Sequence, residues 1–177
     1  MVFGLFRKKN SNERIVEQQY AKLTSTARTP VFYLDMNVPD TVMGRFEMLS
    51  LVMILYFRRT RFSDARGKEI AQAIVDAFFQ DIDHSIRELG VGDSSVPKRM
   101  KKLAKMFYGR LESYAQAMDG ADAVALEAAL RRNIHPTDLA SHEMTALAAW
   151  ALEVDGVLRT VREDDIVAGT IELPVRH

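Results

Sequence analysis

The sequence predicts an all-α protein, a single-domain helical bundle of about six helices that ends in a short extended C-terminal tail. Apolar residues recur at spacings of three and four over several long stretches, which is typical of amphipathic helices. The nine glycines and five prolines fall mostly between those stretches, and no two-residue alternation is sustained before the last ten residues. A chain of 177 residues is long enough for one domain with a hydrophobic core.

The chain divides into three expected parts: an N-terminal amphipathic segment, a helical domain and a C-terminal tail, over residues 1–27, 28–162 and 163–177. The first part contains a short amphipathic helix over residues 12–25. A connector over residues 26–39 follows, and we expect its apolar side chains to lie against the core; these are Val31, Phe32 and Leu34.

The next helix is expected to be the central one. Asp40 or Thr41 is its predicted N-cap, and its stretch MLSLVMILYF, residues 48–57, is apolar on nearly every side. Glu47 and Arg58 bound this stretch, so it covers only about 15 Å, half the thickness of a bilayer core. It is therefore predicted to be a helix covered by its neighbours rather than a membrane span.

Four more helices are expected after it. One begins at Ser63 or Asp64 and ends at Leu89, with Gly90 as a left-handed stop. The remaining three are a helix that ends at Gly120, a shorter helix ADAVALEAALRRN, and a last long helix over residues 138–161. The tail EDDIVAGTIELPVRH is acidic and then extended, either as a short strand or as a strap across the bundle.

Composition excludes several classes of function. Lys plus Arg equals Asp plus Glu, at 24 each, whereas a dedicated nucleic-acid-binding domain is usually clearly basic; we expect no DNA partner. The absence of cysteine excludes disulfides, thiolate catalysis and Cys-type zinc sites. The N-terminus has no apolar stretch of signal-peptide length. There is no nucleophile motif and no glycine-rich phosphate loop, so no catalytic residue and no cofactor is predicted.

A basic cluster in the stretch RELGVGDSSVPKRMKKLAKMFYGR needs an explanation. The helix that starts after the two glycines carries five cations in its first turns: Lys98, Arg99, Lys101, Lys102 and Lys105. Cations at an exposed helix N-terminus cost about 0.3–1 kcal/mol each. One explanation is internal charge matching, with Glu88 near Lys98 and Asp81 near Lys105. The other is an anionic partner: a lipid surface, an acidic protein segment or RNA, of which RNA is disfavoured because no basic strand interleaved with aromatic residues is present.

Other features have ordinary structural explanations. Asp81 and His84 have helical spacing for half of a carboxylate site, but the further ligands of a helical metal centre are missing, so no metal is predicted. The segment FGLFRKK has the composition of an interfacial membrane anchor and equally of a tolerated terminus.

The stretch AIVDAFFQDIDHSIRELGVGDSSVPKRMKKLAKMFYGR, followed by LEAALRRNIH, resembles the ubiquinol–cytochrome c chaperone family. The resemblance extends over roughly residues 40–135, and its most specific part is the order of an acidic helix, RELGVGD, VPKRMKK and FYGR. It implies a non-enzymatic assembly factor of the respiratory cytochrome bc1 complex (complex III). Such a protein binds newly made cytochrome b, or another complex III subunit, at the membrane. In a bacterial member that place is the cytoplasmic, inner face of the energy-transducing membrane.

We predict one docking surface for the partner, formed by the acidic helix, the glycine turn and the basic start of the next helix. Its residues are Asp81, Asp83, Arg87, Glu88, Gly90, Gly92, Asp93, Lys98, Arg99, Lys101 and Lys102, flanked by Tyr108 and Arg110. An anionic membrane surface is a further candidate partner. The alternative function is a helical carrier of a hydrophobic small molecule such as a quinone or a lipid, because the apolar stretch 48–57 is suited to line a cavity.

Overall fold

The computed structural model describes residues 3–90, 92–138 and 142–175, and this part of the chain is folded into helices with no strand. The all-α prediction is therefore confirmed. The described residues form eight helices: α1 (Phe3–Ala27), α2 (Val31–Leu34), α3 (Val42–Thr60), α4 (Ala65–Glu88), α5 (Val96–Asp119), α6 (Ala123–Ile134), α7 (Thr145–Arg159) and α8 (Glu163–Ala168).

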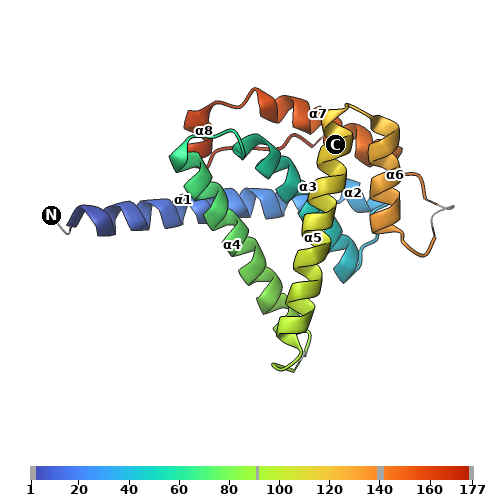
Figure 1. Ribbon diagram of the computed structural model, residues 1–177, viewed down its shortest axis with the longest axis horizontal. Helices are drawn as coiled ribbons and strands as arrows, with labels where there is room; N and C mark the ends of the chain where they lie inside the picture. The colour runs from blue at the N-terminus through green and yellow to red at the C-terminus, as the bar shows by residue number, and fades with distance from the viewer. Residues whose placement is uncertain (1–2, 91, 139–141, 176–177) are drawn as a thin grey trace.

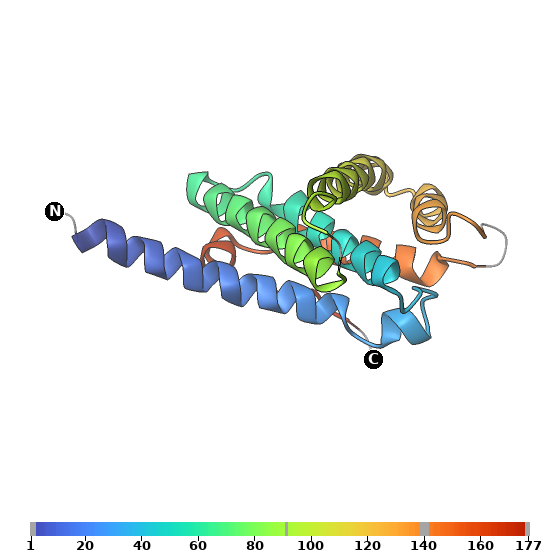
Figure 2. The same cartoon turned by 90° about the horizontal axis from the view of Figure 1, so that it is seen from below.

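Helix α3 is the centre of the molecule. It packs against α1, α4, α5, α6 and α7, with α1 along one side and α5 along the other (Figures 1 and 2). Every residue from Ser50 to Tyr56 is buried. The prediction of a central, covered helix is confirmed, and among the described residues no helix is long and apolar enough to cross a membrane.

Side-chain caps begin several of the helices where the sequence predicts. The Thr41 hydroxyl accepts a hydrogen bond from the Gly44 N–H at 3.1 Å, and the Asp64 carboxylate accepts one from the Gly67 N–H at 2.8 Å. Each cap satisfies a backbone donor that has no partner within the helix. Of the two pairs of candidate caps, the structure thus selects Thr41 and Asp64.

The N-terminal helix is longer than predicted, and the tail explains a buried polar side chain on it. Helix α1 starts at Phe3 rather than at residue 12. Gln19, on its apolar face, is fully buried. Its side-chain amide donates to the Ile171 carbonyl at 2.9 Å and accepts from the Ile171 N–H at 3.0 Å. Of the two expectations for the extended part of the tail, a strand or a strap, the structure shows a strap held to α1. The acidic part before it forms the short helix α8, which was not predicted.

Two apolar side chains at helix ends lie at the surface, and for Leu34 this differs from the expectation. In the connector, Phe32 is buried, and its ring packs in a T-shaped arrangement with that of Trp150, with 4.7 Å between the ring centroids. Leu34, by contrast, is 78% exposed on the short helix α2. Leu89, at the end of α4, is 59% exposed. Both lie where a helix ends and the chain turns, so their side chains point away from the stripe that packs on the core.

The last long helix starts later than predicted. Helix α7 begins at Thr145 rather than at residue 138; of the intervening stretch, residues 139–141 lie outside the described part of the chain. The non-helical segment before α7 is held by side chains from other elements. The Asn37 amide donates to the Glu143 carbonyl at 2.9 Å, and Glu127 accepts from the Met144 N–H at 3.4 Å. These tertiary contacts replace the hydrogen bonds that a helix would have supplied.

We expect Gly44→Ala to destabilise the fold. An added Cβ would lie 1.9 Å from the Pro39 carbonyl oxygen, a backbone atom that cannot move alone, so we expect the free energy of unfolding to fall by about 1–3 kcal/mol. Urea denaturation measures the change. Gly156→Ala is the control: its Cβ meets nothing within 4 Å, and it should stabilise by up to about 1 kcal/mol. Equal stability of the two variants would contradict the packing described for Gly44.

Candidate functional site

Helices α4 and α5 form an antiparallel hairpin whose turn projects at one end of the molecule (Figure 1). Gly90 ends α4 with a φ of 76°, a left-handed conformation that glycine adopts without strain. Four aromatic rings hold the two helices together. The ring centroids of Phe78 and Phe107 are 5.1 Å apart, and those of Phe79 and Tyr108 are 6.3 Å apart. The hairpin brings the predicted docking residues next to the turn together, whereas Tyr108 and Arg110 lie farther along, in the middle of α5.

The acidic side chains of α4 have partners within the chain. Asp81 accepts a hydrogen bond from the Tyr20 hydroxyl at 2.9 Å; burial and this bond raise the pKa of Tyr20, so the phenol stays a donor. Glu88 lies 3.2 Å from His84. The predicted acidic face is therefore partly engaged in holding α4 to α1 and to itself.

Arg87 connects the acidic helix to the turn. Its guanidinium donates to Asp83 at 2.7 Å and to Asp93 at 2.6 Å. These hydrogen bonds raise the pKa of Arg87, first through Asp83. The side chain thus bridges two carboxylates and orders the turn, while remaining 47% exposed.

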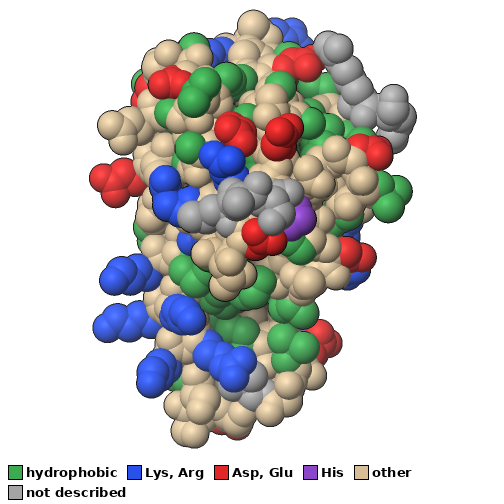
Figure 3. Space-filling model, turned by 90° about the vertical axis from the view of Figure 1, so that its right-hand side faces the viewer, with side chains coloured by type: hydrophobic (Ala, Val, Ile, Leu, Met, Phe, Trp, Pro, Cys, Tyr) green, Lys and Arg blue, Asp and Glu red, His purple; other side chains and the backbone are tan. Residues whose placement is uncertain are grey.

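The cations of α5 that border the turn have no such partners. We call Lys98, Arg99, Lys101 and Lys102 the cationic rim; all four are exposed. Across the described ranges, neither they nor Lys105 take part in an ion pair, and the expected pairs Glu88–Lys98 and Asp81–Lys105 do not form. Internal charge matching therefore does not explain the basic cluster. Figure 3 shows Lys and Arg side chains gathered along one edge of the molecule, beside a patch of hydrophobic side chains.

Arg110 does not belong to the surface, although it was predicted to flank the docking residues. Its side chain is 9% exposed and forms a two-pronged ion pair with Glu47 of α3, with a further hydrogen bond to the Met106 carbonyl at 2.9 Å. Burial raises the pKa of Glu47, and the hydrogen bonds from Arg110 act against that rise. The pair joins α3 to α5 inside the core. Tyr108, by contrast, is 54% exposed as expected.

An apolar groove lies beside the hairpin. It has a volume of about 400 Å³ and is lined by residues of the end of α1, the first half of α3 and the second half of α4. Met43, Phe46, Ile82, Ile86, Leu89 and Leu103 are among its lining residues. Because Met43 and Leu89 are exposed, the groove opens at the surface next to the turn.

No metal site is found in the described part of the chain, where no three residues among His, Asp and Glu gather in a way that could hold an ion. Asp81 and His84, considered as half of such a site, have the separate partners given above.

Three comparisons relate the chain to known proteins. The sequence model of the ubiquinol–cytochrome C chaperone family matches residues 34–173. The chain belongs to the ubiquinol–cytochrome c chaperone family. It is similar to a crystal structure of the Cbp3 homolog from Brucella abortus, with 44% identity, a TM-score of 0.87, and coverage of 99% of this chain and 97% of that one.

This chaperone-family chain also matches ubiquinol-cytochrome-c reductase complex assembly factor 1 from Xenopus laevis. The two are 23% identical over 103 residues, which is 58% of this chain and 51% of the frog protein. The chain therefore aligns with about half the length of that curated relative. The family resemblance predicted from the motifs of α4 and α5 is confirmed.

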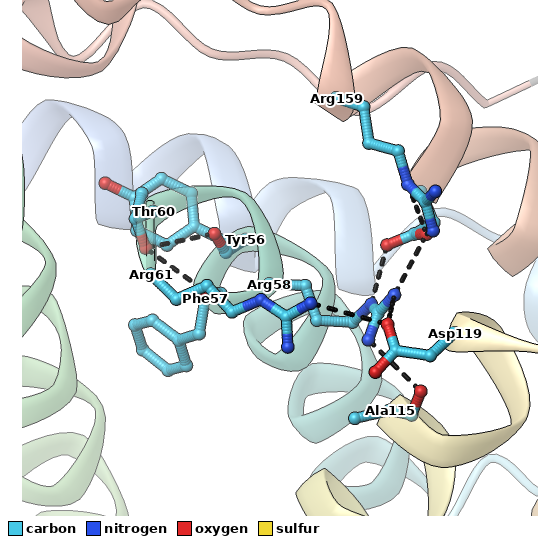
Figure 4. A network of polar contacts seen from close by, with 9 residues as sticks. Tyr56, Phe57, Arg58, Thr60, Arg61, Ala115, Asp119 and Arg159 are labelled. Atoms are coloured by element: carbon cyan, nitrogen blue, oxygen red, sulfur yellow. Dashed lines mark hydrogen bonds and ion pairs between the residues drawn. The ribbon is translucent and has the colours of Figure 1, made fainter. Parts of the chain in front are cut away.

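A second buried ion pair of this chaperone-family chain, which was not predicted from the sequence, lies at the other end of α3. The Arg58 guanidinium donates to Asp155 of α7 at 2.7 Å, to Asp119 of α5 at 2.9 Å and to the Ala115 carbonyl at 3.2 Å (Figure 4). Burial opposes the ionisation of Asp155, but hydrogen bonds from Arg58 and Arg159 outweigh it and hold its pKa below the ordinary value. Glu47 and Arg58 appear in the sequence only as the charged limits of an apolar stretch. Glu47 has apolar neighbours on both sides, Phe46 and Met48, which is a signal for burial, whereas Arg58 is followed by Arg59 and has no such signal.

Loss of Arg110 should destabilise this chaperone-family protein in a pH-dependent way. Arg110→Ala leaves Glu47 buried without its cation, which we expect to cost about 3–5 kcal/mol near neutral pH. The pKa of Glu47, already raised in the folded state, then rises further, so the folded state takes up a proton more readily than the unfolded one. Stability should therefore fall as pH rises and recover in part toward about pH 5.

Urea denaturation at both pH values measures this effect. The matched control is the double replacement Glu47→Leu with Arg110→Leu, which removes both charges and should lose much less stability. If Arg110→Ala is no less stable than the double replacement at neutral pH, the ion pair does not compensate the buried carboxylate.

Proposed function

We propose that this protein is an assembly chaperone of respiratory complex III whose client is newly made cytochrome b. The observation that carries the proposal is the family match over residues 34–173, which includes the α4–α5 hairpin. The name of the frog relative, an assembly factor of the ubiquinol–cytochrome c reductase complex, supports the same role. The protein acts by binding its client rather than by catalysis.

The client docks on the end of the hairpin. The proposed surface comprises Tyr108 and three groups of residues: Asp81, Asp83, Arg87 and Glu88 of α4; Gly90, Gly92 and Asp93 of the turn; and the cationic rim. Two physical properties support it. The unpaired cations of the rim attract acidic segments and set the orientation of approach, and the neighbouring groove accepts apolar side chains of a membrane protein. The exposed Met43 at its mouth adapts to apolar surfaces of different shape.

The proposed place of action is the cytoplasmic, inner face of the energy-transducing membrane, where the chaperone associates peripherally. A client with membrane-spanning segments emerges at that surface, and a chaperone that covers its apolar side chains acts there before the subunits join.

Charge reversal of the rim should weaken capture of the client. With Lys98, Lys101 and Lys102 changed to Glu, we expect cytochrome b bound in detergent extracts to fall at least about tenfold, because three attractive charges become repulsive. Quantitative pull-down measures the loss, and circular dichroism should show unchanged helicity since all three side chains are exposed. The matched control reverses Arg14, Arg66 and Lys68, which are exposed cations on α1 and α4. Normal bc1 complex in cells without the gene would refute the assembly role itself.

A second candidate function, a carrier of a quinone or lipid, rests on the apolar groove. Its volume of about 400 Å³ falls within the range of small-molecule sites. If the protein is a carrier, native mass spectrometry of the purified chain should detect an extractable apolar ligand, and Met43→Glu should release it by placing a charge at the mouth of the groove. A ligand-free preparation rules the carrier function out.

A further inference from the structure

A shallow hollow on the surface is lined by residues of the middle of α5 and the end of α6. Its volume is about 530 Å³. The lining residues are Lys102, Lys105, Met106, Gly109, Arg110, Ser113, Arg132 and Asn133. None of them is acidic, although the chain as a whole has equal numbers of acidic and basic residues.

Three cations of the hollow are available to a ligand. Lys102, Lys105 and Arg132 are exposed, and within the described residues none of them forms an ion pair or a hydrogen bond. The fourth cation, Arg110 in the floor, is neutralised by Glu47. The hollow therefore carries the charge of three unpaired cations, contributed by two helices.

Gly109 keeps the floor of the hollow open. It lies in the interior of α5, where glycine is less favourable than alanine, yet a Cβ added to it would meet nothing within 4 Å. The packing of the bundle thus gives no reason for glycine at this position. Its missing side chain has an effect only outside the fold, where it leaves room between Lys105 and Ser113.

We propose that this hollow binds the phosphate group of an anionic phospholipid headgroup, so that the side of α5 lies against a membrane surface. The three cations supply the charge, and Gly109 supplies the space. The Ser113 hydroxyl donates to the Arg110 carbonyl at 3.3 Å and one Asn133 amide N–H donates to the Ala129 carbonyl at 2.9 Å, so the second Asn133 N–H is the uncharged donor left for the phosphate. The site goes beyond the proposed client surface: of its lining residues only Lys102 belongs to the cationic rim.

Lysine and arginine have different uses in this bundle. Arg58, Arg87 and Arg110 pair with carboxylates, whereas among the lysines whose side chains the structure describes, at positions 22, 68, 98, 101, 102 and 105, Lys22 alone forms an ion pair. Flexible ammonium groups suit an array of phosphates instead, since they need no fixed planar partner.

The shape of the hollow favours an array of anions over a single free one. In an open, water-filled site each charge pair is worth little, so one small anion is held weakly. A membrane presents many phosphates at once, and Lys98 and Lys101 on the same helix then add to the attraction. No aromatic side chain lines the hollow, so it lacks the stacking surface typical of single-stranded RNA sites.

Vesicle flotation with the purified full chain tests the proposal. The protein should float with vesicles of equimolar phosphatidylcholine and phosphatidylglycerol, but not with phosphatidylcholine alone. Replacing Lys105 and Arg132 by Gln should weaken binding about 25-fold, at about fivefold for each cation. The matched control replaces Arg66 and Lys68, two exposed cations of α4, and should bind like the unchanged chain. Equal losses in the two variants would show a diffuse charge effect and overturn the site.

A pair of glycine variants tests the shape of the hollow at constant charge. Gly109→Gln and Gly156→Gln each place a side chain on an exposed helix position with free space around it, and both should raise the melting temperature. Only Gly109→Gln fills the hollow, so it alone should weaken vesicle binding severalfold. Unchanged binding by this variant would contradict a headgroup seated between α5 and α6.

Two competitors identify the source of the phosphate. Inorganic phosphate, at constant ionic strength, should not displace the vesicles; displacement would assign the hollow to a free anion. A single-stranded RNA oligonucleotide that binds more tightly than the vesicles, and loses affinity in the Lys105 and Arg132 variant, would assign it to nucleic acid. That variant should still capture the client in detergent, so failure of the lipid site and failure of the proposed function give different results.

Discussion

The structure depends on the burial of α3 together with a charge at each end of its apolar stretch. A buried charge without a partner costs several kcal/mol, so Glu47 and Arg58 restrict which helices can surround α3. Glu47 requires Arg110 of α5, and Arg58 requires Asp155 of α7 and Asp119 of α5. Helix α5 takes part in both networks, which fixes its position along α3. The α4–α5 hairpin, and with it the surface next to the turn, is placed by these two contacts.

The two kinds of cation have different roles in this bundle. Arginines with planar, multiply bonded guanidinium groups connect helices, as in the Arg58 network and the Glu47–Arg110 pair. The lysines of α5 face away from the core on one side of the same helix and stay unpaired among the described residues. One helix therefore contributes a neutralised inner face and a charged outer face. The inner face holds the fold together, while the outer face is free for the client and the lipid surface proposed above.

The groove offers an apolar surface and the turn a charged one, and a chaperone for a membrane protein needs both. Apolar lining residues open to the surface at Met43 and Leu89, and the cationic rim lies at the same end of the molecule. An exposed apolar patch carries a risk of self-association. Here Arg28, Arg45, Asp81 and Glu88 are among the lining residues of the groove, so charges of both signs lie beside its apolar side chains.

The sequence alone determined the all-α class, the central position of α3, the left-handed stop at Gly90 and the family, because periodicity and turn residues are local signals. It narrowed the caps of α3 and α4 to two residues each, and the structure selected Thr41 and Asp64. It also indicated that α5 starts with an excess of cations. Only the tertiary structure decided which charges are paired: Arg110 lies inward against Glu47, Asp81 binds Tyr20, and Gln19 holds the C-terminal strap. The start of α7 was likewise decided by side chains of distant segments, Asn37 and Glu127. Such partners are far apart in the chain. The residues next to each of these groups in the sequence therefore do not indicate which partner stabilises it.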